Sequence, residues 1–383
     1  MPVLEFIKIS GTPFEAGQAL GRFGSDAVHR HLLHAPVWHR VMKWRDSPLA
    51  AAMAGHVRQR FPRIWQELLG LAEGLGVPFE QVVLWNCRGD LVTQGAGTHD
   101  GCTTVLLPGS EKRRIGHNED GDPGFAGHCA IAECRIEGSP GFASFVYPGS
   151  LPGHTFAVTD AGLAVTVNNL RARHVDAGVP RMVLTRAVLD APDLDTAIAT
   201  LRDTPRAGAF HLTLGHRASP HLLSVEFNAR HCSVQALTQP SLHANHAIHP
   251  AMLDDPQVVT DSSRDRQRRG NALLKEAREA GKAPDPLAIL ADTNDTNDTH
   301  DTNDTHDTGE AALPIHRTDP RDPDGENTLA TADIVIETSH IKWDIYEQPG
   351  TPPRYRLIDG HRQAQDAPPE RTLAAQPGRR TGA

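Results

Sequence analysis

The feature that most constrains the fold is a change of texture at residue 102. Before it, residues 64–74 carry apolar side chains at helical spacing, and residues 13–21 follow a Ser-Gly-Thr sequence typical of a helix N-cap. After it come short β-rich runs separated by Gly, Pro and Asp, which predict an antiparallel meander. The predicted strands of this meander are residues 103–107, 129–136, 143–147, 155–159 and 163–167.

The second half of the chain alternates helices and strands. Two helices are predicted at residues 182–189 and 194–201, strands at 210–214 and 221–227, and a charged helix at 264–280. A late hairpin is predicted from residues 328–337 and 341–346. Strands, then helices, then strands predict a layered α+β domain with helices packed on sheets.

Composition narrows the classes of partner and compartment. A formal net charge of −9 argues against nucleic acid or an anionic membrane as the main partner. No window approaches the roughly 18 apolar residues of a transmembrane helix, and residues 1–10 lack the pattern of a signal peptide. The five cysteines are an odd, scattered set, so we expect a reducing cytoplasm and no disulfide framework.

The pair Gly101-Cys102 carries the clearest chemical signal. A thiol that follows a small residue can attack the preceding carbonyl and shift the peptide to a thioester, which water then releases. The new chain would begin at Cys102 with its α-amine beside its own thiol. An α-amine titrates near ~7.7–8.0, so nucleophile and general base would share one residue.

Six short blocks occur in an order that resembles one family. They resemble the acyl-coenzyme A:6-aminopenicillanic acid acyltransferase family, peptidase family C45, within the N-terminal-nucleophile hydrolases. No single block is specific, but the ordered set spans most of the chain. The blocks are residues 9–17 with 20–21, 70–77 with Asn86, 101–104, 116–120, 162–168 and 243–246.

The resemblance implies an αββα four-layer sandwich, with two antiparallel sheets between helical layers, in a precursor that cuts itself between Gly101 and Cys102. Residues 1–101 would form a mainly helical α chain and residues 102–362 the catalytic β chain, and the two would stay associated. The acidic Asp-Thr repeat at 292–308, which has no apolar residue, and the tail at 363–383 are predicted to be disordered.

The resemblance also assigns roles to residues. Cys102 would be the nucleophile, Asp120 the carboxylate that orients its ammonium, and Asn245 an oxyanion donor. Further candidates for contact with the substrate or the oxyanion are Asn168, Asn118, His117 and Glu119. We interpret His117 and Glu119 as pocket walls or structural contacts more than as proton carriers.

Two patterns nearby have other interpretations. Penicillin-making acyltransferases have an aromatic residue where this chain has Glu119, which speaks against penicillin chemistry. The arginines of the charged helix are interpreted as a solvated face. These arginines are Arg264, Arg266, Arg268 and Arg269.

The sequence therefore predicts a self-processing N-terminal cysteine amidohydrolase or N-acyltransferase. We expect a small acyl amide or acyl thioester as substrate, a thioester intermediate, and no cofactor or metal. Two alternatives stay open. One is a non-catalytic ligand-binding protein on the same fold, and the other is a metal-binding protein that uses His243, His246, His249 and the Asp-rich repeat.

Overall fold

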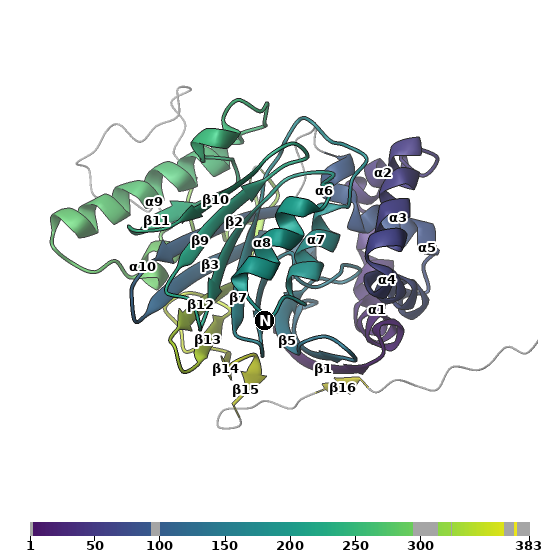
Figure 1. The fold of residues 1–383 in the computed structure, drawn as a ribbon, viewed down its shortest axis with the longest axis horizontal. Coiled ribbons are helices and arrows are strands. Elements are labelled where there is room, and N and C mark those ends of the chain that lie inside the picture. The colour runs from purple at the N-terminus through teal and green to yellow at the C-terminus, as the bar shows by residue number, and fades with distance from the viewer. Residues whose placement is uncertain (1–2, 93–99, 294–312, 323, 364–370, 374–383) are drawn as a thin grey trace, which may run out of the picture.

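Two β-sheets lie between two layers of helices (Figure 1). The computed structural model describes residues 3–92, 100–293, 313–322, 324–363 and 371–373. The expectation for residues 294–308 of the Asp-Thr repeat lies outside this described part of the chain. The layered arrangement confirms the predicted αββα, α+β architecture.

The first sheet has nine strands in the order β10-β9-β8-β7-β6-β5-β4-β1-β16. From β4 to β10 it is an antiparallel meander in chain order, whereas β1 pairs in parallel with both β4 and β16. Its strands are β1 (Glu5–Gly11), β4 (Ala130–Ile136), β5 (Phe142–Val146), β6 (Phe156–Thr159), β7 (Leu163–Asn169), β8 (Phe210–His216), β9 (Leu222–Phe227), β10 (Cys232–Ala236) and β16 (Arg371–Leu373).

The second sheet has seven strands in the order β11-β2-β3-β12-β13-β14-β15, and every pairing in it is antiparallel. The pairing of β12 with β13 confirms the predicted late hairpin. Its strands are β2 (Asp100–Leu107), β3 (Arg113–Gly121), β11 (Ser241–His243), β12 (Asn327–Ile336), β13 (Ile341–Tyr346), β14 (Tyr355–Ile358) and β15 (His361–Arg362).

Helices cover the outer face of each sheet. Helix α1 contacts β1 and β4 and α8 contacts β8 of the first sheet, whereas α9 and α10 lie on the second sheet (Figure 1). The α-helices are α1 (Pro13–Arg30), α2 (Pro36–Met42), α3 (Pro48–Arg60), α4 (Pro62–Leu75), α5 (Phe79–Asn86), α6 (Arg88–Leu91), α7 (Arg181–Val188), α8 (Leu194–Asp203), α9 (Asp261–Glu279) and α10 (Pro286–Leu290). Short 3-10 helices are η1 (Leu32–His34), η2 (Pro123–Phe125) and η3 (Pro250–Met252).

The first helix of the N-terminal region begins where its sequence predicts. Thr12 caps α1 and forms a reciprocal capping box with Glu15. Helices α1 and α4 then pack backbone to backbone through glycines, since a Cβ on Gly17 would overlap the carbonyl oxygen of Glu67 and one on Gly70 that of Phe14.

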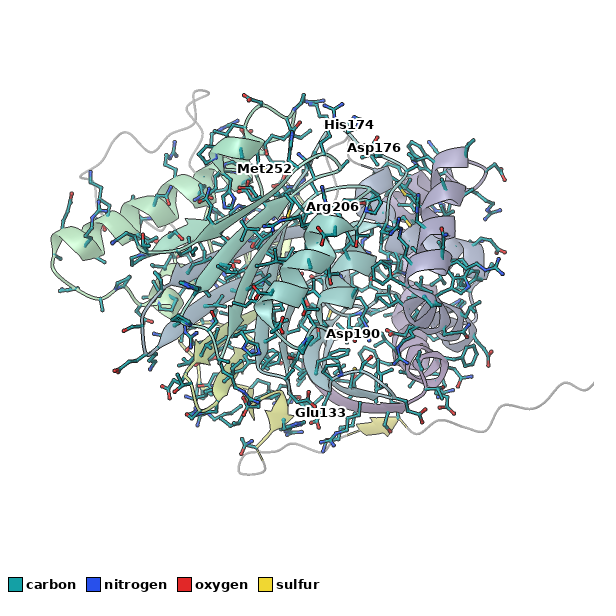
Figure 2. The ribbon with its side chains drawn as sticks, viewed as in Figure 1. Glu133, His174, Asp176, Asp190, Arg206 and Met252 are labelled. Atoms are coloured by element: carbon teal, nitrogen blue, oxygen red, sulfur yellow. The ribbon has the colours of Figure 1, made fainter. Side chains whose placement is uncertain are left out.

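A buried ion pair also joins helix α7 to helix α4. Arg186 of α7 donates to both carboxylate oxygens of Glu67 on α4, at 2.8 and 2.9 Å, and to Asp190 at 2.8 Å. Asp190 lies at the end of α7 in Figure 2. Because Glu67 and Arg186 are buried, loss of either partner would leave a buried charge uncompensated, and the pair therefore holds α7 against α4.

Aromatic side chains fill the space between the sheets. Trp343 of β13 is fully buried and meets Phe156 of β6 edge-to-face, with ring centroids 5.7 Å apart. His117 of β3 also lies edge-on to Phe156, at 5.6 Å. The core therefore reaches directly to the strand that carries the candidate site.

Four expectations need correction. Residues 103–107 lie in the second sheet and not in the meander. The first sheet is mixed, since β1 of the mainly helical N-terminal region runs parallel to its neighbours. Within the tail, residues 371–373 form β16 against β1, whereas the expectation for residues 364–370 and 374–383 lies outside the described part of the chain. Helix α4 runs past Gly74 and ends at Gly76, whose φ of 68° suits a glycine cap.

None of the described helices is by itself long and apolar enough to cross a membrane, although α4 and α5, joined at a 119° bend, pass together on length and composition.

Candidate active site

The pairing of strand β2 with strand β3 places Gly101 and Cys102 opposite the motif at residues 116–120. Gly101 pairs with Asp120, Cys102 with Glu119, and Thr104 with His117. Because side chains alternate along a strand, Cys102 and Glu119 share one face and Asp120 lies on the other. Cys102 and Glu119, which are 17 residues apart in sequence, are thus in direct contact across one ladder.

The backbone of Cys102 lies at an open edge of β2. Strand β11 pairs with β2 only from Thr104 onward, so the amide and carbonyl of Cys102 meet side chains instead. Its N–H donates to Asn245 Oδ1 at 2.9 Å, and its carbonyl accepts from Arg266 Nη1 at 2.6 Å. Both groups of the residue are therefore held on one side of the strand.

Arg266 and Asn245 form one unit. Arg266 Nη2 donates to Asn245 Oδ1 at 2.7 Å, and Nη1 also donates to Thr103 Oγ1 at 2.9 Å. Both side chains are buried, and burial lowers the pKa of Arg266 below its usual value. Asn245 thus presents its oxygen to the Cys102 amide, while its Nδ2 donates to the carbonyl of Asn169 at 3.2 Å.

Asp120 lies on the helix-facing side of β3 and is fully buried. Its Oδ1 accepts from Thr328 Oγ1 at 2.6 Å, and among the described residues its Oδ2 has no hydrogen-bond partner. Arg266 and Arg317 both interact with it electrostatically. A buried carboxylate oxygen opposite Gly101 is a suitable acceptor for an ammonium group formed at residue 102.

Glu326 explains why residue 101 is glycine. A Cβ on Gly101 would overlap Glu326 Oε2, so a larger residue would displace this carboxyl. Glu326 forms a close ion pair with Arg317, and Arg171 lies 3.8 Å from its Oε1. Burial nevertheless raises the pKa of Glu326 to about 7, against the opposing effect of these arginines.

The thiol of Cys102 faces the space between the sheets. Its Sγ donates to Glu119 Oε2 at 3.5 Å, and the same oxygen lies 3.2 Å from His117 Nε2. Tyr147 donates its hydroxyl to Glu119 Oε1 at 3.0 Å. Burial lowers the pKa of His117 to about 3, so its ring is neutral near neutral pH.

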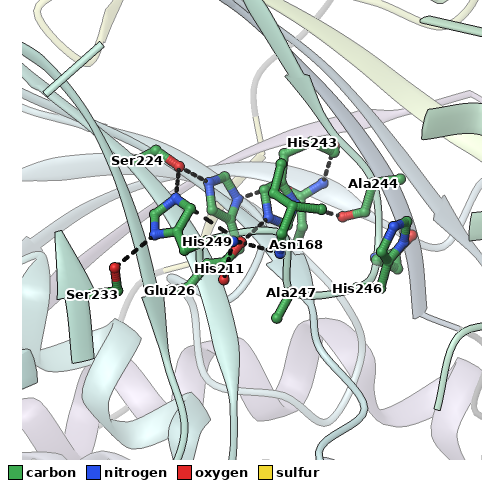
Figure 3. Close-up of polar contacts among 12 residues, drawn as sticks. Asn168, His211, Ser224, Glu226, Ser233, His243, Ala244, His246, Ala247 and His249 are labelled. Atoms are coloured by element: carbon green, nitrogen blue, oxygen red, sulfur yellow. Dashed lines mark hydrogen bonds and ion pairs between the residues drawn. The ribbon is translucent and has the colours of Figure 1, made fainter. Parts of the chain in front are cut away.

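Asn168 extends this polar group away from the thiol. Its Oδ1 accepts from Thr104 at 2.7 Å and from His211 at 3.0 Å, and its Nδ2 donates to the carbonyl of His243 at 3.1 Å. Figure 3 shows Asn168 among these partners. Asn168 therefore joins β2, β7, β8 and β11 from within the protein, and its role as a substrate contact stays a prediction.

Asn118 lies on the opposite face of β3 from Glu119. Its Oδ1 accepts from Thr331 at 2.6 Å, and its Nδ2 donates to the carbonyl of Leu290 at 2.9 Å. It links β3 to β12 and α10, and this placement does not bring its side chain to the thiol.

The three clustered histidines do not converge on one point. His243 contacts Glu226 at 2.8 Å and His249 contacts Ser224 at 2.9 Å, whereas His246 bonds to Ser263 at 2.7 Å and lies apart in Figure 3. Within the described ranges, donor atoms near enough to share a metal ion, all within 4.8 Å, occur instead at Cys102, His117 and Glu119. A thiolate, an imidazole and a carboxylate are ligands that suit zinc.

A largely apolar pocket is lined by Tyr147. Tyr147 also donates to Glu119, so this side chain links the pocket to the neighbourhood of Cys102. Asp122, which contacts His31 at 2.7 Å, and Arg88, stacked on Trp85, are its charged residues. The remaining lining residues are Leu32, Val37, Gly89, Phe125, Pro148 and Ser150.

Arg266 is the main residue that the sequence interpretation misplaced. Arg264 and Arg268 are indeed exposed, but Arg266 is buried and Arg269 pairs with Asp292 at 2.9 Å. Helix α9 turns one face inward, with buried residues at helical spacing. Those residues are Ser262, Ser263, Asp265, Arg266, Gln267, Gly270 and Leu274, whose small and apolar members were the available signal.

Two comparisons with known proteins agree with this geometry. The family described as acyl-coenzyme A:6-aminopenicillanic acid acyl-transferase matches residues 107–342, which is more than half of the chain and includes Asp120 and Asn245. Cys102 lies just before this match. The chain is also 29% identical over 217 residues to a β-alanyl-dopamine/carcinine hydrolase of Drosophila melanogaster. That similarity covers 50% of this chain and 56% of the relative, so it spans little more than half of the relative's length.

Proposed function

Because this chain belongs to the acyl-coenzyme A:6-aminopenicillanic acid acyltransferase family, we propose that it is a self-processing cysteine amide hydrolase or N-acyltransferase. The supporting observation is the setting of Cys102. Its thiol faces the inter-sheet space, its amide nitrogen contacts Asn245, and a buried carboxylate, Asp120, lies opposite the preceding residue. Few structural cysteines need polar groups on every side.

The first step of the proposal is self-cleavage. The Cys102 sulfur attacks the Gly101 carbonyl carbon, the C–N bond to residue 102 breaks, and the nitrogen takes up a proton to become the α-amine. Water then hydrolyses the resulting thioester and leaves a carboxylate on Gly101. Asp120, whose Oδ2 has no hydrogen-bond partner in the described part of the chain, would hold the new ammonium.

The mature reaction uses the same atoms. The α-amine of Cys102 accepts the thiol proton, the thiolate attacks the substrate amide carbonyl, and the protonated amine delivers a proton to the leaving amine. Asn245 would stabilise the oxyanion, which requires its Nδ2 to turn from Asn169 toward the substrate. Water or an acceptor amine then releases the acyl group from sulfur.

The substrate we propose is a small amide with an apolar or aromatic portion. The pocket beside Tyr147 is lined by Trp85 and Phe125 and carries the carboxylate of Asp122. The relative acts, by its name, on β-alanyl-dopamine, an amino-acyl amide of an arylalkylamine. Glu119 occupies the position where penicillin-making acyltransferases have an aromatic residue, so we expect no penicillin-forming activity.

The test is turnover of β-alanyl-dopamine and of simple acyl amides of arylalkylamines by the purified protein. Chromatography would separate free amine, free acid and transferred acyl product, with and without an added acceptor amine. Release of amine and acid in equal amounts would identify a hydrolase, and acyl transfer to the acceptor would identify a transferase. If the native protein releases no amine while Cys102→Ala binds the same compounds equally well, the chain is a binding protein.

A further inference from the structure

Three side chains of different metal-ligating types share one face of the β2–β3 ladder. Cys102 lies directly opposite Glu119, and His117 lies two residues before Glu119 on β3. Because residues two apart on a strand point to the same face, all three side chains enter the space between the sheets. All three are buried, and β3 is paired with β2 on one side and with β12 on the other. Their positions are therefore fixed by the sheet and not by a loop.

The donor atoms of these side chains have the separations of ligands around one ion. Cys102 Sγ lies 3.5 Å from Glu119 Oε2, and His117 Nε2 lies 3.2 Å from the same oxygen. The three donor atoms all lie within 4.8 Å of one another. Zinc bonds of about 2.3 Å to sulfur and about 2.0–2.2 Å to nitrogen or oxygen place tetrahedral ligands roughly 3.2–3.6 Å apart. Both separations at Glu119 Oε2 therefore match a tetrahedral zinc site.

The hydrogen bonds of His117 direct its Nε2 toward this site. Asn168 Nδ2 donates to the carbonyl of His243 at 3.1 Å, and a carbonyl only accepts, so Asn168 Oδ1 must accept the hydroxyl proton of Thr104 at 2.7 Å. Thr104 Oγ1 is then the acceptor in its 2.8 Å contact with His117, and the proton lies on Nδ1. A metal-bound histidine has this arrangement, since its second nitrogen donates to an oxygen that fixes the ring.

Glu119 is oriented in a similar way. Tyr147 donates its hydroxyl to Glu119 Oε1 at 3.0 Å, whereas Oε2 is the oxygen that faces Cys102 and His117. Carboxylates that bind a metal are themselves held by hydrogen bonds of this kind. Three protein ligands around zinc leave the fourth position to water or to another small ligand. The structure therefore supplies three ligands and orients two of them through neighbouring side chains.

We propose that Cys102 Sγ, His117 Nε2 and Glu119 Oε2 form a binding site for a zinc ion, and that the bound ion blocks the reactivity of the Cys102 thiol. On binding, the thiol proton and any proton on the other two donor atoms pass to solvent, and the sulfur donates an electron pair to zinc. The thiolate is both the metal ligand and the nucleophile, so zinc and substrate compete for it. Zinc thus inhibits the proposed enzyme reversibly, a consequence that rests on Cys102 being the nucleophile of the proposed function.

Titration of the purified, metal-free protein with Co²⁺ tests the ligands directly, because cobalt occupies zinc sites and a thiolate bound to it has a charge-transfer absorption band. We expect a band that saturates at one Co²⁺ per chain and that disappears when zinc is added. Cys102→Ala should lose the band, and His117→Ala and Glu119→Gln should each weaken cobalt binding by about tenfold or more. A native protein without the band, or a Cys102→Ala variant that keeps it, would overturn the proposal.

Matched variants separate this site from other metal-binding residues. Cys232→Ala removes a half-buried thiol on β10, and His246→Ala removes a histidine of the 243–249 group. Both variants should keep the native band and affinity, and loss of the band in either would place the metal elsewhere. The Asp-Thr repeat at 292–308 contains no cysteine, so metal bound there gives no thiolate band. Thermal unfolding shows whether each variant folds, and Glu119→Gln, which nearly keeps the native shape, supplies the result if His117→Ala does not fold.

Alkylation by iodoacetamide, with mass spectrometry to locate the adduct, measures whether zinc captures the thiol. Saturating zinc should slow alkylation of Cys102 by about tenfold or more and leave that of Cys232 unchanged, and excess EDTA should restore the rate. Alkylation of Cys102 that zinc does not slow would overturn the proposal.

Amine release from β-alanyl-dopamine distinguishes this inference from the proposed function. Release that zinc suppresses and EDTA restores supports both. Release that zinc increases would overturn the present inference, because the ion would then serve the reaction instead of blocking it. If no amine is released under any condition while zinc still protects Cys102 from alkylation, the zinc site stands and the proposed function fails.

Discussion

The two faces of the β2–β3 ladder differ in charge although they are one strand thickness apart. The helix-facing side gathers Asp120, Arg266, Arg317 and Glu326, which interact with one another as buried charged groups. The side between the sheets carries Cys102 with His117, whose ring burial keeps neutral. The same ladder therefore places a cluster of buried charges on one face, and on the other the thiol beside a neutral ring and the carboxyl group of Glu119.

This difference matches the two groups that Cys102 contributes under the proposed mechanism. Its nitrogen lies at the strand edge, where the oxygen of Asn245 and the carboxylate of Asp120, opposite Gly101, would favour an ammonium. Its sulfur lies on the inner face, where a neighbouring anion would hinder ionisation. One residue can serve as base and nucleophile because the strand separates the two environments.

The largest effect is expected from Cys102→Ala. This variant should remain a single chain and should release no amine from β-alanyl-dopamine, because both the self-cleavage and the turnover lack their nucleophile. Intact mass and amine release are the two measurements. Cys232→Ala, which changes a half-buried cysteine on β10, is the control and should behave as the native protein. If Cys102→Ala still released amine, the thiol on the inner face would not be the nucleophile.

Asn245→Ala tests the edge between the two faces. If Asn245 donates to the oxyanion, kcat should fall by ~10²–10³ with a smaller change in KM. Steady-state kinetics on matured protein would measure both constants, with Asn271→Ala on the exposed side of α9 as the control. A rise in KM alone would instead identify Asn245 as a ground-state contact.

Arg266→Lys tests the role of the charged, helix-facing side of the β2–β3 ladder. Lysine keeps the charge but cannot hold Cys102, Thr103 and Asn245 with one planar fork. We expect kcat/KM to fall by about 10-fold to 100-fold, since the nucleophile would lose its position. Arg264→Lys, two residues away on the exposed side of the same helix, should have native kinetics. Equal kinetics for the two variants would show that charge alone is needed.

Among these variants, Glu326→Gln should change turnover least. Its clearest effect should be on how the free energy of unfolding depends on pH. The pKa of Glu326 is about 7 in the folded protein against 4.5 for an ordinary glutamate, so the folded state binds the proton more tightly. Its contribution to stability is full below pH 4.5 and is lost as pH rises through 7.

The free energy of unfolding of the native protein, relative to Glu326→Gln, should therefore fall by about 3 kcal/mol at most between pH 4.5 and 8. Denaturant unfolding at several pH values would measure this difference. The exposed Glu73→Gln should give a difference that is flat with pH, and a flat curve for Glu326→Gln would mean that this carboxyl is ionised throughout.

Local patterns predicted the parts of the fold that have their own periodicity. The strands of the meander from β4 to β9, helices α7 and α8, and the β12–β13 hairpin lie within a few residues of the predicted ranges. Strand β3 was missed because its motif reads as a turn near Asp120-Gly121, whereas pairing on both sides with β2 and β12 makes it a central strand. Strand β16 was missed because its three residues depend on β1, more than 350 residues away.

The candidate site divides in the same way. The order of the sequence blocks and the family resemblance placed Cys102 and the 116–120 motif in one candidate site. They did not predict which side chains share a face of the β2–β3 ladder. Arg266 needed the orientation of α9, and Glu326 needed a contact between residues 101 and 326 that no local pattern encodes. Tyr147 lay in a predicted strand, and nothing in its neighbourhood pointed to a hydroxyl beside Glu119.

The most direct test of the central claim is the intact mass and N-terminal sequence of the purified, active protein. We expect two associated chains, the second beginning at Cys102, and a single acyl adduct on that residue when an amide substrate is trapped during turnover. A protein that stays full length and still releases amine would contradict the claim, because Cys102 would then have no free α-amine to act as its base.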